Sequence, residues 1–187
     1  MKTLAFPIIV GLTILAFIGC VSAAPPKDPS GIDISVSRLT RSEVLQTFGS
    51  SPDQPNPYRM PGGLLMGYPH EFVVLKIAIN AISQTDIMVD QIAAIGTDGK
   101  PVARYYDLPE FCDYLSGWAS LSKILPQNLE IAKDTYLPGP DFQTRKGQRT
   151  YYAVLIGKNP LPRPFTIKVS LGFNNAPERQ FSIDVTR

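Results

Sequence analysis

Alternating apolar and polar residues at both ends of the folded part of the chain constrain its architecture most. Ile32, Ile34 and Val36 alternate with polar neighbours. The same alternation recurs over residues 165–171 and 181–185. A period of two residues places successive side chains on opposite faces of a strand, so each stretch predicts a strand with one buried face. We therefore expect a mainly β protein.

The middle of the chain adds strands joined by a characteristic turn. Residues 71–82 are the strongest strand prediction, and residues 86–95 predict a second strand with a bulge near residues 90–91, where the alternation slips. The Asp-Gly pair at 98–99 is typical of a tight hairpin. Residues 102–106 would then return as the partner strand. Further strands are expected over residues 149–156 and near residues 129–132.

Two helix starts interrupt this pattern. Thr40 and Glu43 have the spacing of a capping box and predict a helix over residues 41–48. Asp107 predicts the cap of a second helix. The apolar face of that helix would combine residues at spacings of three and four, namely Phe111, Tyr114, Leu115 and Trp118. One or two short helices are therefore expected beside the strands.

Six to eight short strands at this spacing predict an immunoglobulin-like antiparallel β-sandwich with one or two short helices. The 18 prolines and 14 glycines supply the many turns that such a fold needs. A closed β-barrel is the alternative that the same pattern allows. Residues 32–187 are enough for a single domain of this kind.

The charge balance excludes one large class of function. The formal net charge is only +2 over 187 residues. Proteins that bind nucleic acid usually carry a concentrated basic surface, since most of their affinity comes from phosphate contacts. We therefore expect no nucleic-acid partner. The oligomeric state is left open by the sequence.

The N-terminus has the pattern of a secretory signal. Lys2 precedes an uncharged, mostly apolar run over residues 4–19. The end of this run, Phe17-Ile18-Gly19-Cys20, resembles the lipobox of bacterial lipoproteins, with Phe17 where leucine is usual. The resemblance implies a signal peptide over residues 1–19 and a lipid on Cys20.

A lipid on Cys20 would hold the protein in the cell envelope, at the outer membrane or the periplasmic face of a membrane. The proline-rich residues 20–31 would then form a tether. Two alternatives stay open. Cleavage before Ala24 would release a soluble secreted or periplasmic protein, and an uncleaved run would serve as a membrane anchor.

Few residues suggest chemistry. The chain has one histidine, His70, and its second cysteine, Cys112, would have no disulfide partner if Cys20 is lipidated or removed. One histidine and one domain cysteine cannot supply a typical closed zinc site. We therefore expect no metal site, no cofactor and no enzymatic activity.

Two groups of side chains are candidate contacts. The long Pro/Gly-rich segment over residues 49–70 could present an exposed partner surface through Tyr58, Leu64, Leu65, Met66 and Tyr68. The alternative is that this segment packs on the core. Tyr114 and Trp118 could instead form an aromatic platform for a ligand.

These observations lead to two hypotheses for function. The first is a membrane-anchored envelope lipoprotein that acts as a non-enzymatic interaction or assembly module, with another envelope protein as its partner. The second is a secreted or anchored module that binds carbohydrate or peptidoglycan through Tyr114 and Trp118. Burial of these aromatic rings would count against the second.

Overall fold

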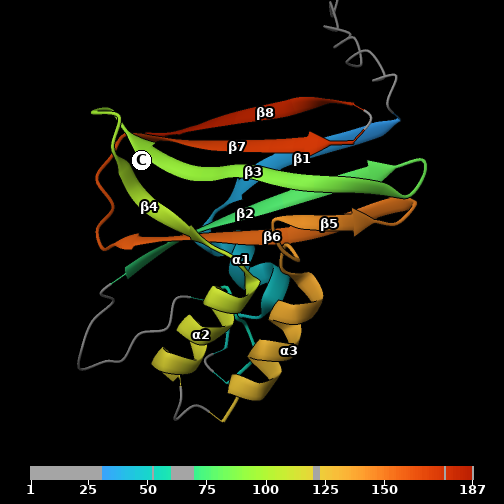
Figure 1. Cartoon of the computed structure of the whole chain (residues 1–187). Coiled ribbons are helices and arrows are strands. Elements are labelled where there is room, and N and C mark those ends of the chain that lie inside the picture. The colour runs from blue at the N-terminus through green and yellow to red at the C-terminus, as the bar shows by residue number, and fades with distance from the viewer. Residues whose placement is uncertain (1–30, 52, 60–69, 120–122, 175, 187) are drawn as a thin grey trace, which may run out of the picture.

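The computed structural model describes residues 31–51, 53–59, 70–119, 123–174 and 176–186. This part of the chain folds as one curved antiparallel sheet with three helices on one side (Figure 1). The signal peptide, Cys20 and most of the tether lie outside the described residues. None of the three helices in the described ranges combines the length and apolarity needed to cross a bilayer.

Eight strands in the described residues pair in the order β1-β2-β6-β4-β3-β7-β8, and β5 pairs with β3. Every pairing is antiparallel. The strands are β1 (Ile32–Leu39), β2 (His70–Ala81), β3 (Thr85–Gly96), β4 (Pro101–Tyr106), β5 (Asp141–Thr144), β6 (Gly147–Lys158), β7 (Phe165–Phe173) and β8 (Ala176–Val185).

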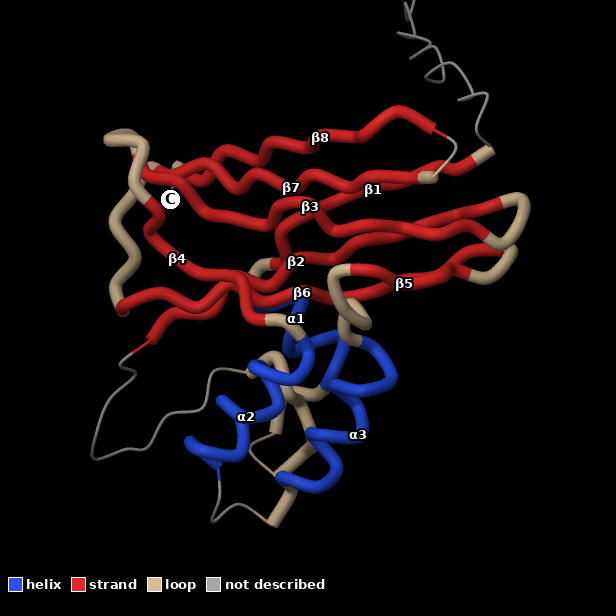
Figure 2. The backbone as a smooth tube through the Cα atoms, in the orientation of Figure 1, coloured by secondary structure: helices blue, strands red, loops and turns tan. Residues whose placement is uncertain are grey.

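The sheet curls until its first and last strands approach each other. Figure 2 shows β7 and β8 at the top of the sheet, near β1. Arg179 of β8 donates a hydrogen bond of 2.7 Å to the carbonyl oxygen of Ile32 in β1. The prediction of a mainly β, antiparallel fold is thus confirmed. The sheet is nearly closed, and its immunoglobulin-like character stays a prediction.

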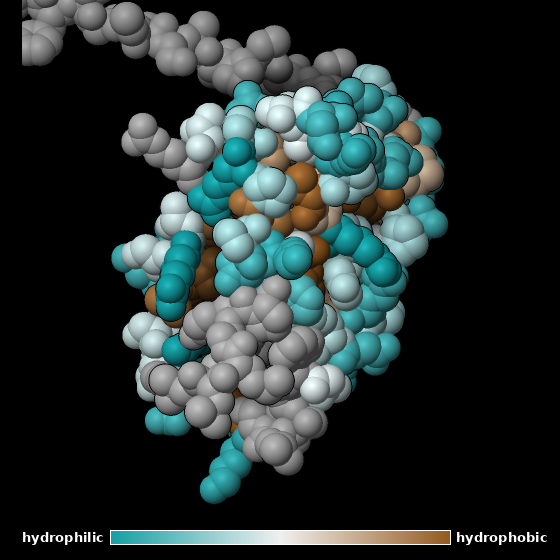
Figure 3. All heavy atoms as spheres, turned by 90° about the vertical axis from the view of Figure 1, so that its left-hand side faces the viewer, coloured by the Kyte–Doolittle hydropathy of each residue, from teal (hydrophilic) through white to brown (hydrophobic). Residues whose placement is uncertain are grey.

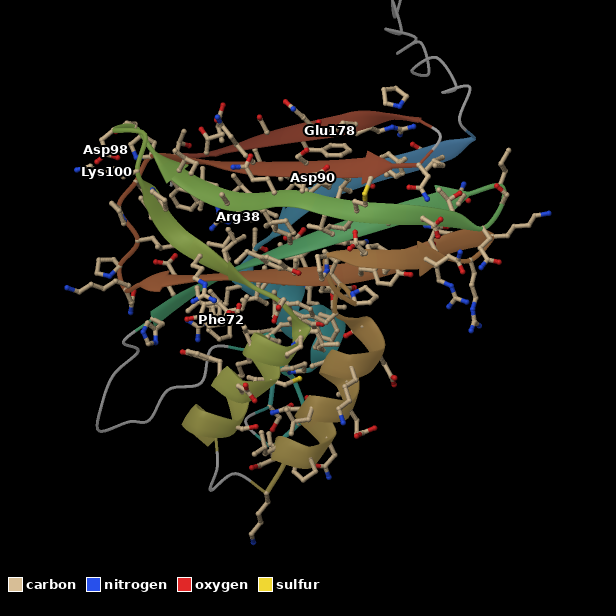
Figure 4. All side chains as sticks on the ribbon, in the orientation of Figure 1. Arg38, Phe72, Asp90, Asp98, Lys100 and Glu178 are labelled. Atoms are coloured by element: carbon tan, nitrogen blue, oxygen red, sulfur yellow. The ribbon has the colours of Figure 1, made fainter. Side chains whose placement is uncertain are left out.

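Several details expected from the sequence are present. The pairing of β3 with β7 shifts register between Val89 and Gln91, where the bulge was predicted. The hairpin between β3 and β4 turns at Gly99, whose φ of 79° suits glycine. The Asp98 side chain accepts the Lys100 backbone N–H at 3.0 Å in the same turn (Figure 4).

The helices are α1 (Arg41–Phe48), α2 (Leu108–Ala119) and α3 (Leu125–Thr135). Both predicted helix starts are confirmed. Glu43 N–H donates to Thr40 Oγ1 at 3.3 Å, and the Thr40 N–H donates to the Glu43 carboxylate at 2.7 Å. At α2, Glu110 N–H donates to Asp107 Oδ1 at 2.9 Å.

The strand expected near residues 129–132 is wrong, because these residues belong to α3. The chain therefore has three helices in the described ranges, not one or two. Pro126 lies at the start of α3, where its fixed φ favours a helix. Asn128 and Ala132, four residues apart, are its buried positions. The periodicity of a short apolar run does not distinguish a helix from a strand, and here tertiary packing determines the helix.

One tyrosine joins the helical layer to the sheet. Tyr136, directly after α3, is 1% exposed. Its hydroxyl accepts the Val154 backbone N–H at 3.0 Å and donates to the Tyr106 carbonyl oxygen at 2.5 Å. Since both partners belong to strands, this side chain fixes α3 against β4 and β6.

Candidate anion-binding site

The buried face of β1 has a charged residue, Arg38, near its C-terminal end. Ile32 and Ile34 are 5% and 8% exposed, and Arg38 follows them on the same face because alternate residues of a strand share a face. Arg38 is only partly exposed. An arginine therefore continues an apolar series into the end of the sheet.

The neighbouring strand extends beyond β1 at this end. The last pair of β1 and β2 is Leu39 with Val74. The β2 strand begins earlier, at His70, and from there it pairs with β6. Among the described strands, residues 70–73 thus have a partner on only one side. The chain leaves this edge at Thr40 to form α1.

A cavity of about 440 Å³ lies here. Within the described part of the chain, its charged lining consists of four arginines and one glutamate, namely Arg38, Arg41, Arg59, Arg163 and Glu71. Apolar side chains supply much of the remaining wall, namely Leu39, Val44, Leu45, Phe72 and Val74. The volume is in the range of ordinary ligand pockets.

The cavity reaches both faces of β2. Glu71 and Phe72 are neighbours in the strand, so their side chains point to opposite faces. The Phe72 ring lies 6.2 Å from that of Phe111 in α2, which places it on the helix side. In Figure 4, Phe72 is labelled beside the helices and Arg38 on the other side of β2. The cavity therefore wraps around the open edge.

Both carboxylate oxygens of Glu71 already have partners within the protein. Its Oε1 lies 2.5 Å from an Arg163 guanidinium nitrogen, and its Oε2 accepts the Leu161 backbone N–H at 3.0 Å. The Glu71 side chain is 18% exposed. Both oxygens of Glu71 therefore have a partner, and among the described residues no other arginine of the cavity forms an ion pair with it.

Arg38 is partly buried, and no described carboxylate forms an ion pair with it. Among the described residues it has no hydrogen-bond or ion-pair partner. Burial lowers the pKa of its guanidinium from the ordinary value, the positive charge of Arg163 lowers it further, and Glu71 offsets part of the shift. The folded protein thus holds a charged side chain where its charge is disfavoured.

Arg41 and Arg59 add positive charge at the same place. Arg41 is the first residue of α1, where the positive end of the helix dipole disfavours a cation. Arg59 donates a long hydrogen bond, 3.4 Å, to the Ser50 carbonyl oxygen. Local conflicts of this kind are expected mainly at functional sites.

Figure 3 views the molecule from the end that includes the start of β2 and the end of β6. Apolar surface is visible there between hydrophilic side chains. The described lining of the cavity also combines charged and apolar side chains. The arrangement suits an anion that also carries apolar groups, because guanidinium groups bind carboxylates and phosphates through fixed N–H pairs.

Tyr58, expected on an exposed contact surface, is buried. It is 2% exposed, and its hydroxyl lies 2.8 Å from Thr135 Oγ1. Its ring packs 4.5 Å from Phe48 and 6.0 Å from Phe111. Packing of these rings between α1, α2 and the sheet explains why the predicted exposure is wrong for Tyr58, although Tyr58 also lines the arginine cavity. The other proposed contacts, Leu64, Leu65, Met66 and Tyr68, lie outside the described residues.

The second predicted site is described only in part. Tyr114 is partly buried, and its hydroxyl lies 3.0 Å from His70 Nδ1. Its ring packs 5.6 Å from Phe72 and 5.8 Å from Tyr106. Burial raises the pKa of Tyr114 to about 12. The Trp118 side chain lies outside the described residues, so the pairing of Tyr114 with Trp118 as a platform stays a prediction.

Cys112 has the environment of a structural thiol. It is free, partly buried and packed against the hydrophobic core. Burial is the main cause that raises the pKa of its thiol, whereas a reactive cysteine needs a lowered pKa. Within the described ranges, no group of three or more metal-ligating residues could hold a metal ion.

The arginine cavity could not be found from sequence spacing. Arg38 and Arg41 are close in the chain, but Arg59 and Arg163 come from distant segments. Only the pairing of β2 with β6 brings the β6–β7 connection beside the end of β1. One local signal was available, namely an arginine directly after the capping Thr40.

Comparisons with known proteins do not assign a family. The sequence matches no protein-family model and no curated protein. The crystal structure of a FixG-related protein from Vibrio parahaemolyticus is similar over 84% of this chain and 96% of that chain, with 10% sequence identity and a TM-score of 0.40. We base no functional assignment on a likeness at this level.

Proposed function

We propose that this protein is a lipid-anchored, non-enzymatic binding module of the cell envelope that holds an anionic group of a partner protein in its arginine cavity. The observation that carries the proposal is the cavity itself. It gathers four arginines around one glutamate, and that glutamate is already paired with Arg163.

The chemistry of the lining favours binding over catalysis. A guanidinium stays protonated at all physiological pH values, so it orients and neutralises an anion but does not transfer a proton. Arg38, Arg41 and Arg59 are thus suited to recognition. A bound anion would also relieve the cost of keeping Arg38 charged and partly buried.

The position of the cavity fits an anchored protein. The proposed tether would enter β1 at Ile32, and the cavity lies where β1 ends at Leu39. Eight residues of strand separate the two points by about 23 Å at roughly 3.3 Å per residue. A lipid on Cys20 would therefore leave the cavity at the far end of the strand, available to a partner.

Two further expectations remain part of the proposal. The antiparallel pairing supports the immunoglobulin-like sandwich, whereas the approach of β8 to β1 within a single sheet supports its alternative, the closed β-barrel. The carbohydrate or peptidoglycan module has less support, because the Tyr114 ring packs against other aromatic side chains and its hydroxyl lies against His70.

Thermal unfolding of the full chain tests the cavity. Sodium sulfate is compared with sodium chloride at equal ionic strength for the wild type and for a double variant, Arg38→Met with Arg41→Gln. A ligand at ten times its Kd adds about 1.4 kcal/mol to the free energy of unfolding. We expect a saturable sulfate effect of this kind in the wild type that the double variant loses.

The matched control is Lys168→Gln, which removes an exposed cation from β7, outside the cavity. This variant keeps the full sulfate effect if the cavity is the site. Sulfate also stabilises proteins generally through exclusion from their surface. An identical sulfate response in all three proteins would therefore reject the anion-binding function.

The anchor has a separate test. Intact mass and palmitate labelling are measured for the wild type and for Cys20→Ala. The proposal predicts lipid on the wild type and none on the variant. An unlipidated wild-type protein whose mature chain starts at Ala24 would reject the lipid anchor and leave a soluble secreted protein.

A further inference from the structure

The edge of β2 that no described strand covers runs through the arginine cavity. From Glu71 to Val73, β2 pairs with β6 on one side and with no described strand on the other. Glu71, Phe72 and Val74 also line the cavity. Backbone N–H and C=O groups on a strand edge are the groups to which an added strand binds. The cavity thus offers main-chain partners as well as positive charge.

We infer that the cavity receives an extended acidic peptide segment of the partner, which adds as a strand to the edge of β2 and places its carboxylates against Arg38 and Arg41. The inference rests on the proposed function and specifies its ligand. Main-chain hydrogen bonds would supply affinity, and the side chains of the cavity would supply specificity.

The two sides of the edge differ in chemistry. Arg38 and Glu71 lie on the inner face of the sheet, with Arg163 paired to Glu71. Leu39, Val44 and Phe72 form the apolar wall on the helix side. Successive side chains of an added strand point to opposite faces. The matching peptide therefore alternates acidic and apolar residues.

Carboxylates suit this cavity better than a phosphate group. A phosphate concentrates a charge of about −1.5 to −2 on one centre. Carboxylates spaced along a peptide can meet Arg38 and Arg41 separately, since these two arginines come from different elements, the end of β1 and the start of α1.

The experiment uses a designed probe and the full chain. The probe is an acetylated and amidated octapeptide of alternating aspartate and valine, and binding is measured by titration calorimetry. We expect saturable binding that weakens about tenfold in Arg38→Gln, as for the loss of one hydrogen bond to a charged group. Lys168→Gln should bind the probe as the wild type does.

Two modified probes test the two halves of the inference. An asparagine–valine peptide keeps the shape and removes the charges, so it should not bind detectably. An aspartate–valine peptide with N-methyl groups on alternate residues keeps the charges but cannot complete the strand hydrogen bonds. It should bind at least fivefold more weakly than the parent probe.

Each result has a distinct meaning. Equal binding of the N-methylated and parent peptides would overturn the strand addition. Tighter binding of inorganic phosphate than of the peptide would overturn the ligand class. Both results would leave the anion-binding function standing if Arg38→Gln still weakens binding. No effect of Arg38→Gln on peptide, phosphate or sulfate would overturn the inference together with the proposed function.

Discussion

Two arginines of the cavity should respond to the same substitution with opposite signs. Arg38→Met keeps an unbranched apolar stem and removes a partly buried charge that has no counter-ion among the described residues. Arg163→Met removes the partner of Glu71, a carboxylate whose side chain is only 18% exposed. We expect the first change to stabilise the fold and the second to destabilise it.

The magnitudes follow from these environments. Relief of like-charge repulsion near a protein surface is worth about 0.2–1 kcal/mol, so Arg38→Met should raise the free energy of unfolding by about 0.5 kcal/mol. Leaving a charged group short of one partner costs about 1–3 kcal/mol. For a domain of this size 1 kcal/mol shifts Tm by about 2–4 °C, so Arg163→Met should lower Tm by roughly 2–12 °C.

Urea and thermal unfolding of the wild type and both variants provide the assay, with Lys168→Met as a control for loss of an exposed cation. Arg38→Met should also bind the anion more weakly although it is more stable. This combination is characteristic of a residue retained for function at some cost in stability. Destabilisation of Arg38→Met by as much as Arg163→Met would show that Arg38 supports the fold, and would refute the reasoning.

Three further predictions concern the fold around the site. Tyr136→Phe removes the hydroxyl that is hydrogen-bonded to the Val154 N–H and to the Tyr106 carbonyl oxygen. It should lower the free energy of unfolding, measured in urea, by about 2–4 kcal/mol. A decrease below about 0.5 kcal/mol would contradict the role of this hydroxyl. Gly157→Ala should lower Tm, because the added Cβ would lie 2.3 Å from Leu161 Cδ2 and 2.5 Å from the Val102 carbonyl oxygen. Gly117→Ala in α2 should instead stabilise by roughly 0.5–1 kcal/mol, because its added Cβ would meet no described atom within 4 Å beyond its chain neighbours and the helix backbone. Burial raises the pKa of Tyr114 from 10 to about 12, so between these pH values the folded state keeps a proton that the unfolded state loses. The free energy of unfolding should therefore fall as the pH rises from 10 to 12. Unfolding in this range that is not accompanied by the rise in tyrosinate absorbance would contradict the prediction.

The sequence allowed the local structure to be predicted where local interactions decide it. The capping pair Thr40 and Glu43 located α1, because both of its hydrogen bonds join residues three apart. The slipped alternation near residues 90–91 located the bulge in β3. In contrast, α3 was missed because its short apolar pattern is compatible with either type of element, and packing determines the choice.

The arginine cavity could not be predicted from sequence patterns for a different reason. The capping Thr40 and the end of β1 at Leu39 are local features. The uncovered edge of β2, however, exists because β2 and β6 continue to pair beyond the last pair of β1 with β2, Leu39 with Val74. Tyr58 was misplaced because a residue in a Pro-rich segment entered the aromatic cluster of the core. Both features depend on contacts between segments that are remote in the chain.

The most direct test of the arginine cavity follows the arginine side chains themselves. In a full-chain sample labelled with ¹⁵N, the Nε–H signals are recorded during titration with the aspartate–valine octapeptide. We predict that Arg38 and Arg41 shift together and saturate at one common Kd, while the exposed Arg145 and Arg149 stay nearly unchanged. Equal, non-saturating shifts of all four signals would show only general charge screening, and would contradict a binding site in the cavity.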